Sequence, residues 1–147
     1  QFRYPVGLAL NYDSTRLIVA DTGNDRIQIF SSGGQFIRSV GQGGRTIANE
    51  LGSPYFRQPY DVAFSGDLIF VTDEGNHRIQ IVNQEGQLVR SLGTKQPQHA
   101  LKGSDLCVKS PPLGNFLRPR NILPGPGGVI LVSDHDHTRV QMLVPTE

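Results

Sequence analysis

One cassette of residues returns three times along the 147-residue chain, and it constrains the fold more than any other feature of the sequence. Each copy holds an apolar stretch that ends in Asp, and an Arg follows five residues after that Asp. The pairs are Asp21 with Arg26, Asp73 with Arg78, and Asp134 with Arg139. A second block, residues 34–41, recurs as residues 86–93 and is missing after the third copy. A chain built in this way is expected to fold as similar modules packed in series.

Each copy has the pattern of four short β-strands. In the first copy, runs of β-branched and aromatic residues alternate with Asn, Asp, Ser and Gly, which favour turns. The predicted strands are residues 6–10, 16–20, 26–30 and 36–40. Residues 17–20 of the second strand are all apolar, which predicts cover on both faces, whereas the fourth strand mixes in polar residues as an outer strand does. Small antiparallel sheets that neighbouring copies cover on both faces are the blades of a β-propeller.

We therefore predict an all-β fold in which the whole chain, residues 1–147, is one propeller segment. It contains three four-stranded antiparallel blades and thus forms a partial or half propeller. The blades are expected at about residues 2–41, 56–93 and 116–144, the last without its fourth strand. The 17 Gly and 10 Pro residues fit this turn-rich fold and argue against long helices.

The repeated residues resemble those of the NHL repeat. The resemblance rests on Val-Ala-Asp-Thr-Gly-Asn-Asp-Arg-Ile-Gln-Ile-Phe at residues 19–30 and on Val-Thr-Asp-Glu-Gly-Asn-His-Arg-Ile-Gln at residues 71–80. The third copy departs from this pattern, since His135, Asp136 and His137 occupy the turn and Asn121 stands where the first copy has Gly7. The resemblance implies a propeller fold, usually of six blades, and a function in binding more often than in catalysis.

The recurrent Asp and Arg residues are interpreted as structural rather than catalytic. A pair that returns in every blade is expected to serve every blade, and the Asp that ends one strand faces the Arg that opens the next across a tight turn. A charge-assisted pair in this place would fix the turn and tie adjacent blades together. Asn24 and Asn76, in the same turns, are expected to supply a left-handed backbone position or side-chain bonds to the backbone.

Binding residues are expected on one face of the propeller, here called the loop face. This face holds the turns between the second and third strands of each blade and the long inter-blade segments 41–58 and 93–118. Long loops on a rigid scaffold commonly carry recognition. Tyr60 and Arg120 follow the cassette prolines at the start of the innermost strands, close to the mouth of the channel. The other candidates on this face are Tyr55, Lys95, Lys102, Lys109 and Arg118.

The leading interpretation is a non-catalytic platform that recognises a protein partner through the loop face. RNA binding is the alternative, because residues 95–120 hold five basic residues against the single acid Asp105, and aromatic side chains lie nearby for base stacking. The resemblance supports this alternative, since RNA binding is known among NHL propellers. The net charge of only +1 favours the protein partner, because most nucleic-acid-binding domains are strongly basic. In the family, such propellers often form the substrate-recruiting or RNA-recruiting end of larger proteins, including tripartite-motif ubiquitin ligases.

A metal-dependent lyase or hydrolase is the second alternative. His135 and His137, beside Asp134 and Asp136, are weak candidates for metal ligands on the loop face. Some propellers similar to the NHL type are metal-dependent amidating lyases, but their ligand set cannot be matched here residue by residue, so no metal or cofactor is expected. Cys107 is the one cysteine of the chain, which excludes an internal disulfide.

The sequence also supports expectations about the surroundings of the protein. We find no pattern of a signal peptide, a membrane span or an N-glycosylation acceptor, which favours an intracellular, cytoplasmic setting away from membranes.

The three predicted blades are fewer than the blades of a closed propeller, which number about four to eight. A second copy, or further blades in the parent polypeptide, is therefore expected to complete the ring. In the dimer, Phe2 and Tyr4 of one chain are expected to pack around Val140 and Met142 of the other.

Overall fold

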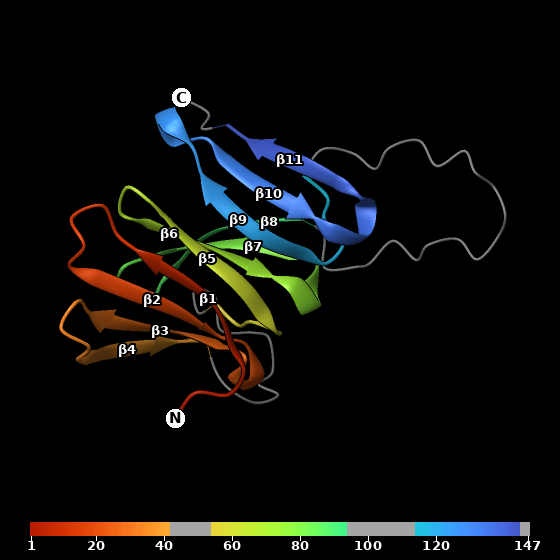
Figure 1. Ribbon diagram of the computed structural model, residues 1–147. Helices are drawn as coiled ribbons and strands as arrows, with labels where there is room; N and C mark the ends of the chain where they lie inside the picture. The colour runs from red at the N-terminus through yellow and green to blue at the C-terminus, as the bar shows by residue number, and fades with distance from the viewer. Residues whose placement is uncertain (42–53, 94–113, 145–147) are drawn as a thin grey trace, which may run out of the picture.

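The computed structural model describes residues 1–41, 54–93 and 114–144, which form three antiparallel β-sheets packed in series (Figure 1). The first sheet contains β1 (Pro5–Leu10), β2 (Arg16–Asp21), β3 (Arg26–Ser31) and β4 (Phe36–Val40). The second contains β5 (Pro59–Ser65), β6 (Leu68–Asp73), β7 (Arg78–Asn83) and β8 (Leu88–Leu92). The third contains β9 (Pro119–Pro124), β10 (Ile130–Asp134) and β11 (Arg139–Leu143). These sheets are here called blades 1, 2 and 3.

The predicted fold class is confirmed, because each sheet is an antiparallel meander in which neighbours along the chain are neighbours in the sheet. The four strands of blade 1 lie within one residue of the predicted ranges. Burial follows the expected pattern: residues 18–21 of β2 are buried, while β4 is mostly exposed apart from Val40. Blade 3 has three strands among the residues that the structure describes.

Short 3₁₀ turns join the second and third strands of each blade. They are η1 (Thr22–Asn24), η2 (Glu74–Asn76) and η4 (His135–His137), and a further one, η3 (Pro126–Gly128), joins β9 to β10. The first three each end at a residue in the left-handed region, namely Asp25, His77 and Thr138, with φ between 51° and 55°. The left-handed residue is therefore the one after Asn24 or Asn76, and not the Asn itself. The other alternative of the sequence analysis, a side-chain bond to the backbone, is found for Asn24, whose Nδ2 donates to Gln1 O at 3.2 Å.

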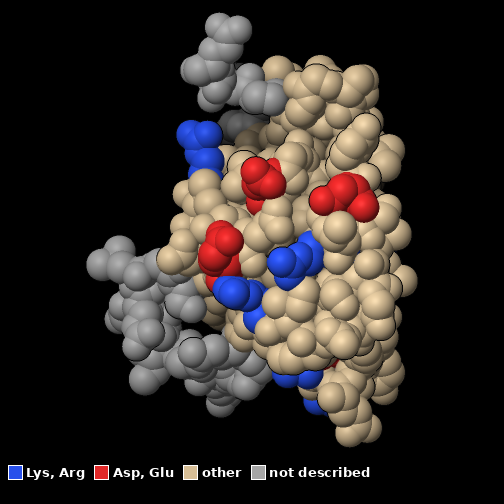
Figure 2. Space-filling view, turned by 90° about the vertical axis from the view of Figure 1, so that its left-hand side faces the viewer, with Lys and Arg blue, Asp and Glu red and all other residues tan. Residues whose placement is uncertain are grey.

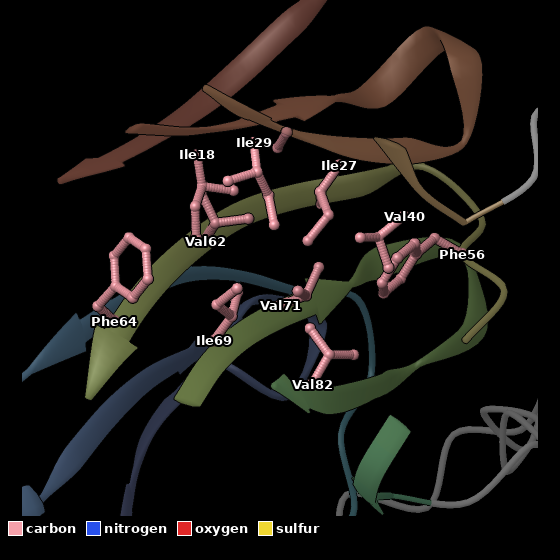
Figure 3. Close-up of a cluster of buried hydrophobic side chains, with 11 residues drawn as sticks. Ile18, Ile27, Ile29, Val40, Phe56, Val62, Phe64, Ile69, Val71 and Val82 are labelled. Atoms are coloured by element: carbon pink, nitrogen blue, oxygen red, sulfur yellow. The ribbon is translucent and has the colours of Figure 1, made fainter. Parts of the chain in front are cut away.

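The hydrophobic core lies between blades rather than within them. Figure 3 shows one cluster, in which Ile18, Ile27 and Ile29 of blade 1 face Val62 and Val71 of blade 2. A second cluster joins blades 2 and 3. Its buried members are Ala63, Ile79, Phe116, Ile122, Ile130 and Val132. Because each sheet exposes apolar side chains on both faces, a blade gains its hydrophobic stabilisation only by contacting another blade.

The first strand of each blade contains a β-bulge just after its proline. The register shifts between Pro5 and Leu8 in β1 and between Pro59 and Val62 in β5, and β9 has the same irregularity opposite β10. A bulge releases backbone groups from the ladder of their own sheet. In β9 these groups bond to blade 2 instead: Ile122 N donates to Asp61 Oδ2 at 3.0 Å, and Arg120 O accepts from Thr72 Oγ1 at 2.7 Å.

We predict that Gly7→Ala destabilises the contact between blades 1 and 2. A Cβ atom on Gly7 would lie 2.6 Å from the backbone Cα of Asp61, so β1 and β5 would have to separate. Overpacking of this kind costs about 1–3 kcal/mol of the free energy of unfolding. Gly33→Ala is the matched control, since a Cβ there meets only the Ser31 hydroxyl at 3.7 Å. Thermal melts of the two variants should differ clearly, and equal melting temperatures would contradict the close approach.

Candidate functional site

The loop face is formed by the three 3₁₀ turns and by the segments that lead into β1, β5 and β9. In Figure 1 these turns lie on the right of the blades, and the hairpin turns of the opposite face lie on the left. Each entering segment is held by the Asp that ends the second strand of its own blade, through backbone N–H groups of Arg3, Arg57 and Leu117 at 2.7 Å. The same carboxylate thus holds both the turn and the entry of the chain into the blade.

Asp73 shows the full bonding pattern of this carboxylate. It is completely buried and accepts hydrogen bonds from Arg57 N, Asn76 Nδ2, Arg78 Nε and Gln80 Nε2, at distances of 2.7 to 3.0 Å. Arg78 and Gln80 also donate to the carbonyl of Tyr55 at 2.8 and 2.6 Å. All the donors belong to blade 2 or to the segment that enters it.

Blades 1 and 3 repeat this arrangement with one change of residue. Asp21 accepts from Asn24, Arg26 and Gln28, whereas Asp134 accepts from His137, Arg139 and Gln141. Burial raises the pKa of both carboxyls, but their hydrogen-bond donors outweigh it and hold the pKa below the usual value. The Asp–Arg pairs form inside a blade, so they do not tie adjacent blades as the sequence analysis expected.

Other side chains make the bonds between blades. Thr22 Oγ1 donates to Pro59 O at 2.7 Å, and Asp25 Oδ1 accepts from Gln58 N at 2.8 Å. At the next junction Thr72 and Asp61 bond to β9, and His77 Nδ1 accepts from Arg118 N at 3.1 Å. Desolvation raises the pKa of Asp61, although two backbone N–H groups donate to it.

A charged cluster lies on the loop face at the junction of blades 2 and 3. Its centre is Glu74, whose Oε1 lies 3.0 Å from Arg118 Nη2 and 3.0 Å from Arg120 Nε. Glu74 is only 6% exposed, so both arginines are drawn toward one buried carboxylate. The guanidinium carbon of Arg120 also lies 5.4 Å from the centre of the Tyr60 ring, within the range of a cation–π contact.

Two residues of η4 complete this cluster. Arg120 Nη1 lies 3.0 Å from His135 Nε2, and since a guanidinium can only donate, Nε2 is the acceptor. The ring proton is then on Nδ1, which donates to Asp136 Oδ1 at 2.6 Å. Asp136 also lies 4.0 Å from Arg118. We call Tyr60, Glu74, Arg118, Arg120, His135 and Asp136 the junction cluster.

The structure brings some of the predicted binding residues together and separates others. Tyr60, Arg118 and Arg120 share the junction cluster. Tyr55 lies apart from them, with its ring 5.2 Å from the Arg78 guanidinium and its hydroxyl 3.3 Å from Asn76. Lys95, Lys102 and Lys109 lie outside the described residues.

The sequence analysis missed Glu74, the centre of the cluster, and His77. The available signal was a departure from the repeat: Glu74 stands where blade 1 has Thr22, and His77 stands where it has Asp25. Both positions are in the turn after the second strand, which the repeat places on the loop face.

The two candidate metal ligands have different partners. His135 lies in the junction cluster, while His137 donates to Asp134 from the position that Asn24 and Asn76 occupy in the other blades. Within residues 1–41, 54–93 and 114–144, the structure contains no group of three or more His, Cys, Asp or Glu placed to hold a metal ion. His137 therefore takes the place of the repeat Asn as a donor to the buried carboxylate.

The face of the hairpin turns has a different character. Figure 2 shows that acidic and basic side chains lie interspersed on this face, and that uncharged surface covers most of it. Neither sign of charge dominates there.

None of the helices in the described part of the chain is long and apolar enough to cross a membrane.

Comparison with known structures indicates the class of protein to which this fold belongs. The chain superposes on an auxiliary nutrient binding protein from Bacteroides thetaiotaomicron with a TM-score of 0.65, at 13% sequence identity over 92% of this chain and 36% of that one. At this identity the likeness concerns the fold alone. Together with the serial antiparallel meanders, it defines the chain as a segment of a β-propeller.

The sequence comparisons identify the family. The family model described as NHL repeat matches residues 2–30 and 56–82, in blades 1 and 2. The protein named brain tumor from Drosophila melanogaster is 41% identical over 99 residues, which cover 67% of this chain and 9% of that protein. The human E3 ubiquitin-protein ligase NHLRC1 is 32% identical over 60% of this chain and 21% of its own length. The chain belongs to the NHL-repeat proteins, and it spans only a small part of these relatives.

We predict that Asp73→Ala lowers the free energy of unfolding by about 3–5 kcal/mol, because it leaves Arg78 buried without its carboxylate. Asp21→Ala should cost less, since the Arg26 side chain is 27% exposed and can be hydrated, against 8% for Arg78. Chemical denaturation of both variants measures the two costs. Equal costs would show that exposure of the Arg does not set the penalty, and an unchanged stability of Asp73→Ala would contradict the structural role.

We predict that His137→Asn retains the stability of the wild-type protein to within about 0.5 kcal/mol, because it restores the residue of the other two blades. His137→Ala is the matched control and should cost about 1 kcal/mol, since it removes a donor to Asp134. Denaturation is measured with and without Zn²⁺ and with a chelator. A stabilisation by Zn²⁺ that His137→Asn abolishes would instead establish His137 as a metal ligand.

Proposed function

We propose that the chain is a non-catalytic binding module that recognises a protein partner through the junction cluster on the loop face. The observation that carries this proposal is the composition of the cluster. It combines two arginines, a tyrosine, a histidine and two carboxylates at one junction between rigid blades. Tyr and Arg are enriched in protein–protein interfaces and in their hot spots.

The balance of charge in the cluster favours a protein over RNA. Arg118 and Arg120 are balanced by Glu74 and Asp136, so the four side chains together carry no net charge. Binding of an RNA backbone draws its affinity from unbalanced Lys and Arg that release counterions from phosphates. A protein surface, with its own mixture of charges, can pair with both signs at once.

Exposure indicates which side chains a partner would reach. The Arg118 side chain is 45% exposed and that of His135 is 48% exposed. The Glu74 side chain is only 8% exposed, and its carboxylate holds both arginines from the buried side of the cluster. Because Arg120 is held by Glu74, Tyr60 and His135, it is presented in one orientation. A side chain that is already ordered loses less conformational entropy on binding.

The proposal is tested with a peptide-display library selected on the immobilised protein, followed by titration of the selected peptides. We expect Arg118→Ala to weaken their binding by about tenfold or more, as truncation of an interface Arg commonly does. Arg90→Ala is the matched control, because Arg90 is an exposed arginine on the outer strand β8. Melting curves confirm that both variants fold.

Two results would overturn the proposal. Selected peptides that bind Arg118→Ala as tightly as the wild-type protein would remove the junction cluster as the site. Binding of a mixed-sequence RNA pool at about 50 mM salt, with an affinity that falls steeply as salt rises and is reduced in Arg118→Ala, would replace the protein partner by RNA.

A further inference from the structure

One hydrogen bond is repeated at both junctions between blades, but its acceptor differs. The residue just before the cassette proline donates its backbone N–H to the left-handed residue that ends the turn of the preceding blade. At the first junction Gln58 N donates to Asp25 Oδ1 at 2.8 Å, and at the second Arg118 N donates to His77 Nδ1 at 3.1 Å. A carboxylate thus holds the first junction and an imidazole holds the second.

The bond at the second junction fixes the protonation state of His77. A backbone N–H group only donates, so Nδ1 carries a lone pair and the ring is neutral, with its proton on Nε2. An imidazolium has an N–H group at both nitrogens and would direct a second donor at the Arg118 amide. The Asp25 side chain keeps an acceptor oxygen in either of its protonation states. Protonation of the ring therefore breaks the bond at the second junction alone.

The turn of blade 2 holds the backbone of His77 in place. His77 N donates to Glu74 O at 3.1 Å, and the backbone is left-handed, with φ of 55°. Gly93 lies close behind it, since a Cβ atom on Gly93 would lie 2.9 Å from His77 O. Because His77 is held by its own blade, loss of the bond loosens the segment of blade 3 that donates it.

The donor of this bond belongs to the junction cluster. The Arg118 side chain lies 3.0 Å from Glu74 of blade 2 and 4.0 Å from Asp136 of blade 3. The backbone of Arg118 is left-handed, with φ of 51°, a conformation that is uncommon for residues other than Gly. The bond to His77 holds this backbone against blade 2, and the place of the guanidinium depends on it.

Four charged groups of the described residues face His77. Glu74 comes from its own turn, and the others come from the segments entering β5 and β9 and from η4, namely Arg57, Arg118 and Asp136. Desolvation lowers the pKa of His77, the two arginines lower it further, and the two carboxylates oppose them. The neutral ring, which can accept the bond, is therefore favoured more strongly in the folded protein than in the unfolded chain.

We propose that His77 is a positioning residue of the junction cluster, and that its protonation releases Arg118 from blade 2. The neutral ring holds the Arg118 backbone and, through it, the guanidinium that a partner would contact. The protonated ring loosens the second junction and weakens binding, while the first junction is unaffected. The consequence for binding rests on the proposed function, whereas the consequence for the contact between blades does not.

An NMR titration between about pH 8 and pH 5 tests the bond directly. At the upper end the His77 ring should be the Nε2–H tautomer, and its midpoint should lie below about 6.5, the usual value for His. The amide signal of Arg118 should shift with the same midpoint. The Gln58 amide is the matched control, because it bonds to Asp25 and should not follow this titration. An Nδ1–H tautomer, or an Arg118 amide that does not respond to the ring, would overturn the proposal.

Two variants separate the acceptor from its titration. His77→Asn keeps an acceptor oxygen, tolerates the left-handed backbone and does not ionise, whereas His77→Ala removes the acceptor. Folding lowers the pKa of His77, so the unfolded chain takes up the proton first. The stabilisation is complete above about pH 6.5 and is lost as the pH falls toward the folded pKa, by up to about tenfold in the folding equilibrium constant per pH unit. Chemical denaturation should show that His77→Asn lacks this loss, and identical pH profiles of the two proteins would contradict the proposal.

Selected peptides that contain no His extend the test to binding. The wild-type protein should bind them about three- to tenfold more weakly at about pH 5.5 than at about pH 7.5, as expected for loss of one hydrogen bond. His77→Asn should bind equally at both pH values, and His77→Ala should bind weakly at both.

The failure of this inference can be told from the failure of the proposed function. Equal wild-type binding at both pH values, with a ring that titrates between them, would disprove the positioning role and leave the junction cluster as the site. Peptides that bind without needing Arg118 would disprove the proposed function instead. The NMR and denaturation results would then still decide whether His77 holds the second junction.

Discussion

The buried carboxylate at the end of the second strand is the interaction on which the rest of the blade depends. In each blade it accepts hydrogen bonds from one backbone N–H of the entering segment, one side chain of the 3₁₀ turn and two side chains of the third strand. An ion of this kind is stable away from water only because each of its lone pairs is used. These donors connect the turn and the entering segment to one carboxylate, and the bulge of the first strand, as in β9, presents backbone groups to the preceding blade.

The residues that all three blades share and the residues that differ between blades have separate roles in this chain. The repeat residues build three nearly identical turns, so they cannot distinguish one junction from another. The junction cluster arises where the copies differ. Glu74 of blade 2 and His135 of blade 3 stand where blade 1 has Thr22, and Arg120 of blade 3 stands where blade 1 has Val6. These substitutions place a cluster of charges at the junction of blades 2 and 3, which is why the candidate binding site lies there.

Much of the architecture could be predicted from residue spacing. The strands followed from alternating runs and turn residues, and the buried second strand followed from its apolar residues. The Asp–Arg pairs were also predicted with the correct partners, but they form within a blade and do not tie adjacent blades. Sequence spacing relates residues within one copy, so it could not show that the carboxylate bonds to its own entering segment while Thr72 and Asp61 bond to the neighbouring blade. Glu74 was missed because a lone acid in a turn resembles any solvated residue.

The sequence by itself determined the repeating blade, because strand period, turn chemistry and the recurring Asp are local properties of the chain. The tertiary structure decided which groups of different blades meet. Two arginines that appeared to form a free basic patch are balanced by a buried glutamate and by Asp136, and a histidine that resembled a metal ligand serves as the donor to Asp134. The ion pairs join segments that the sequence separates by more than forty residues, so their distances are set only when the blades pack, whereas His137 lies three residues from Asp134 within one turn.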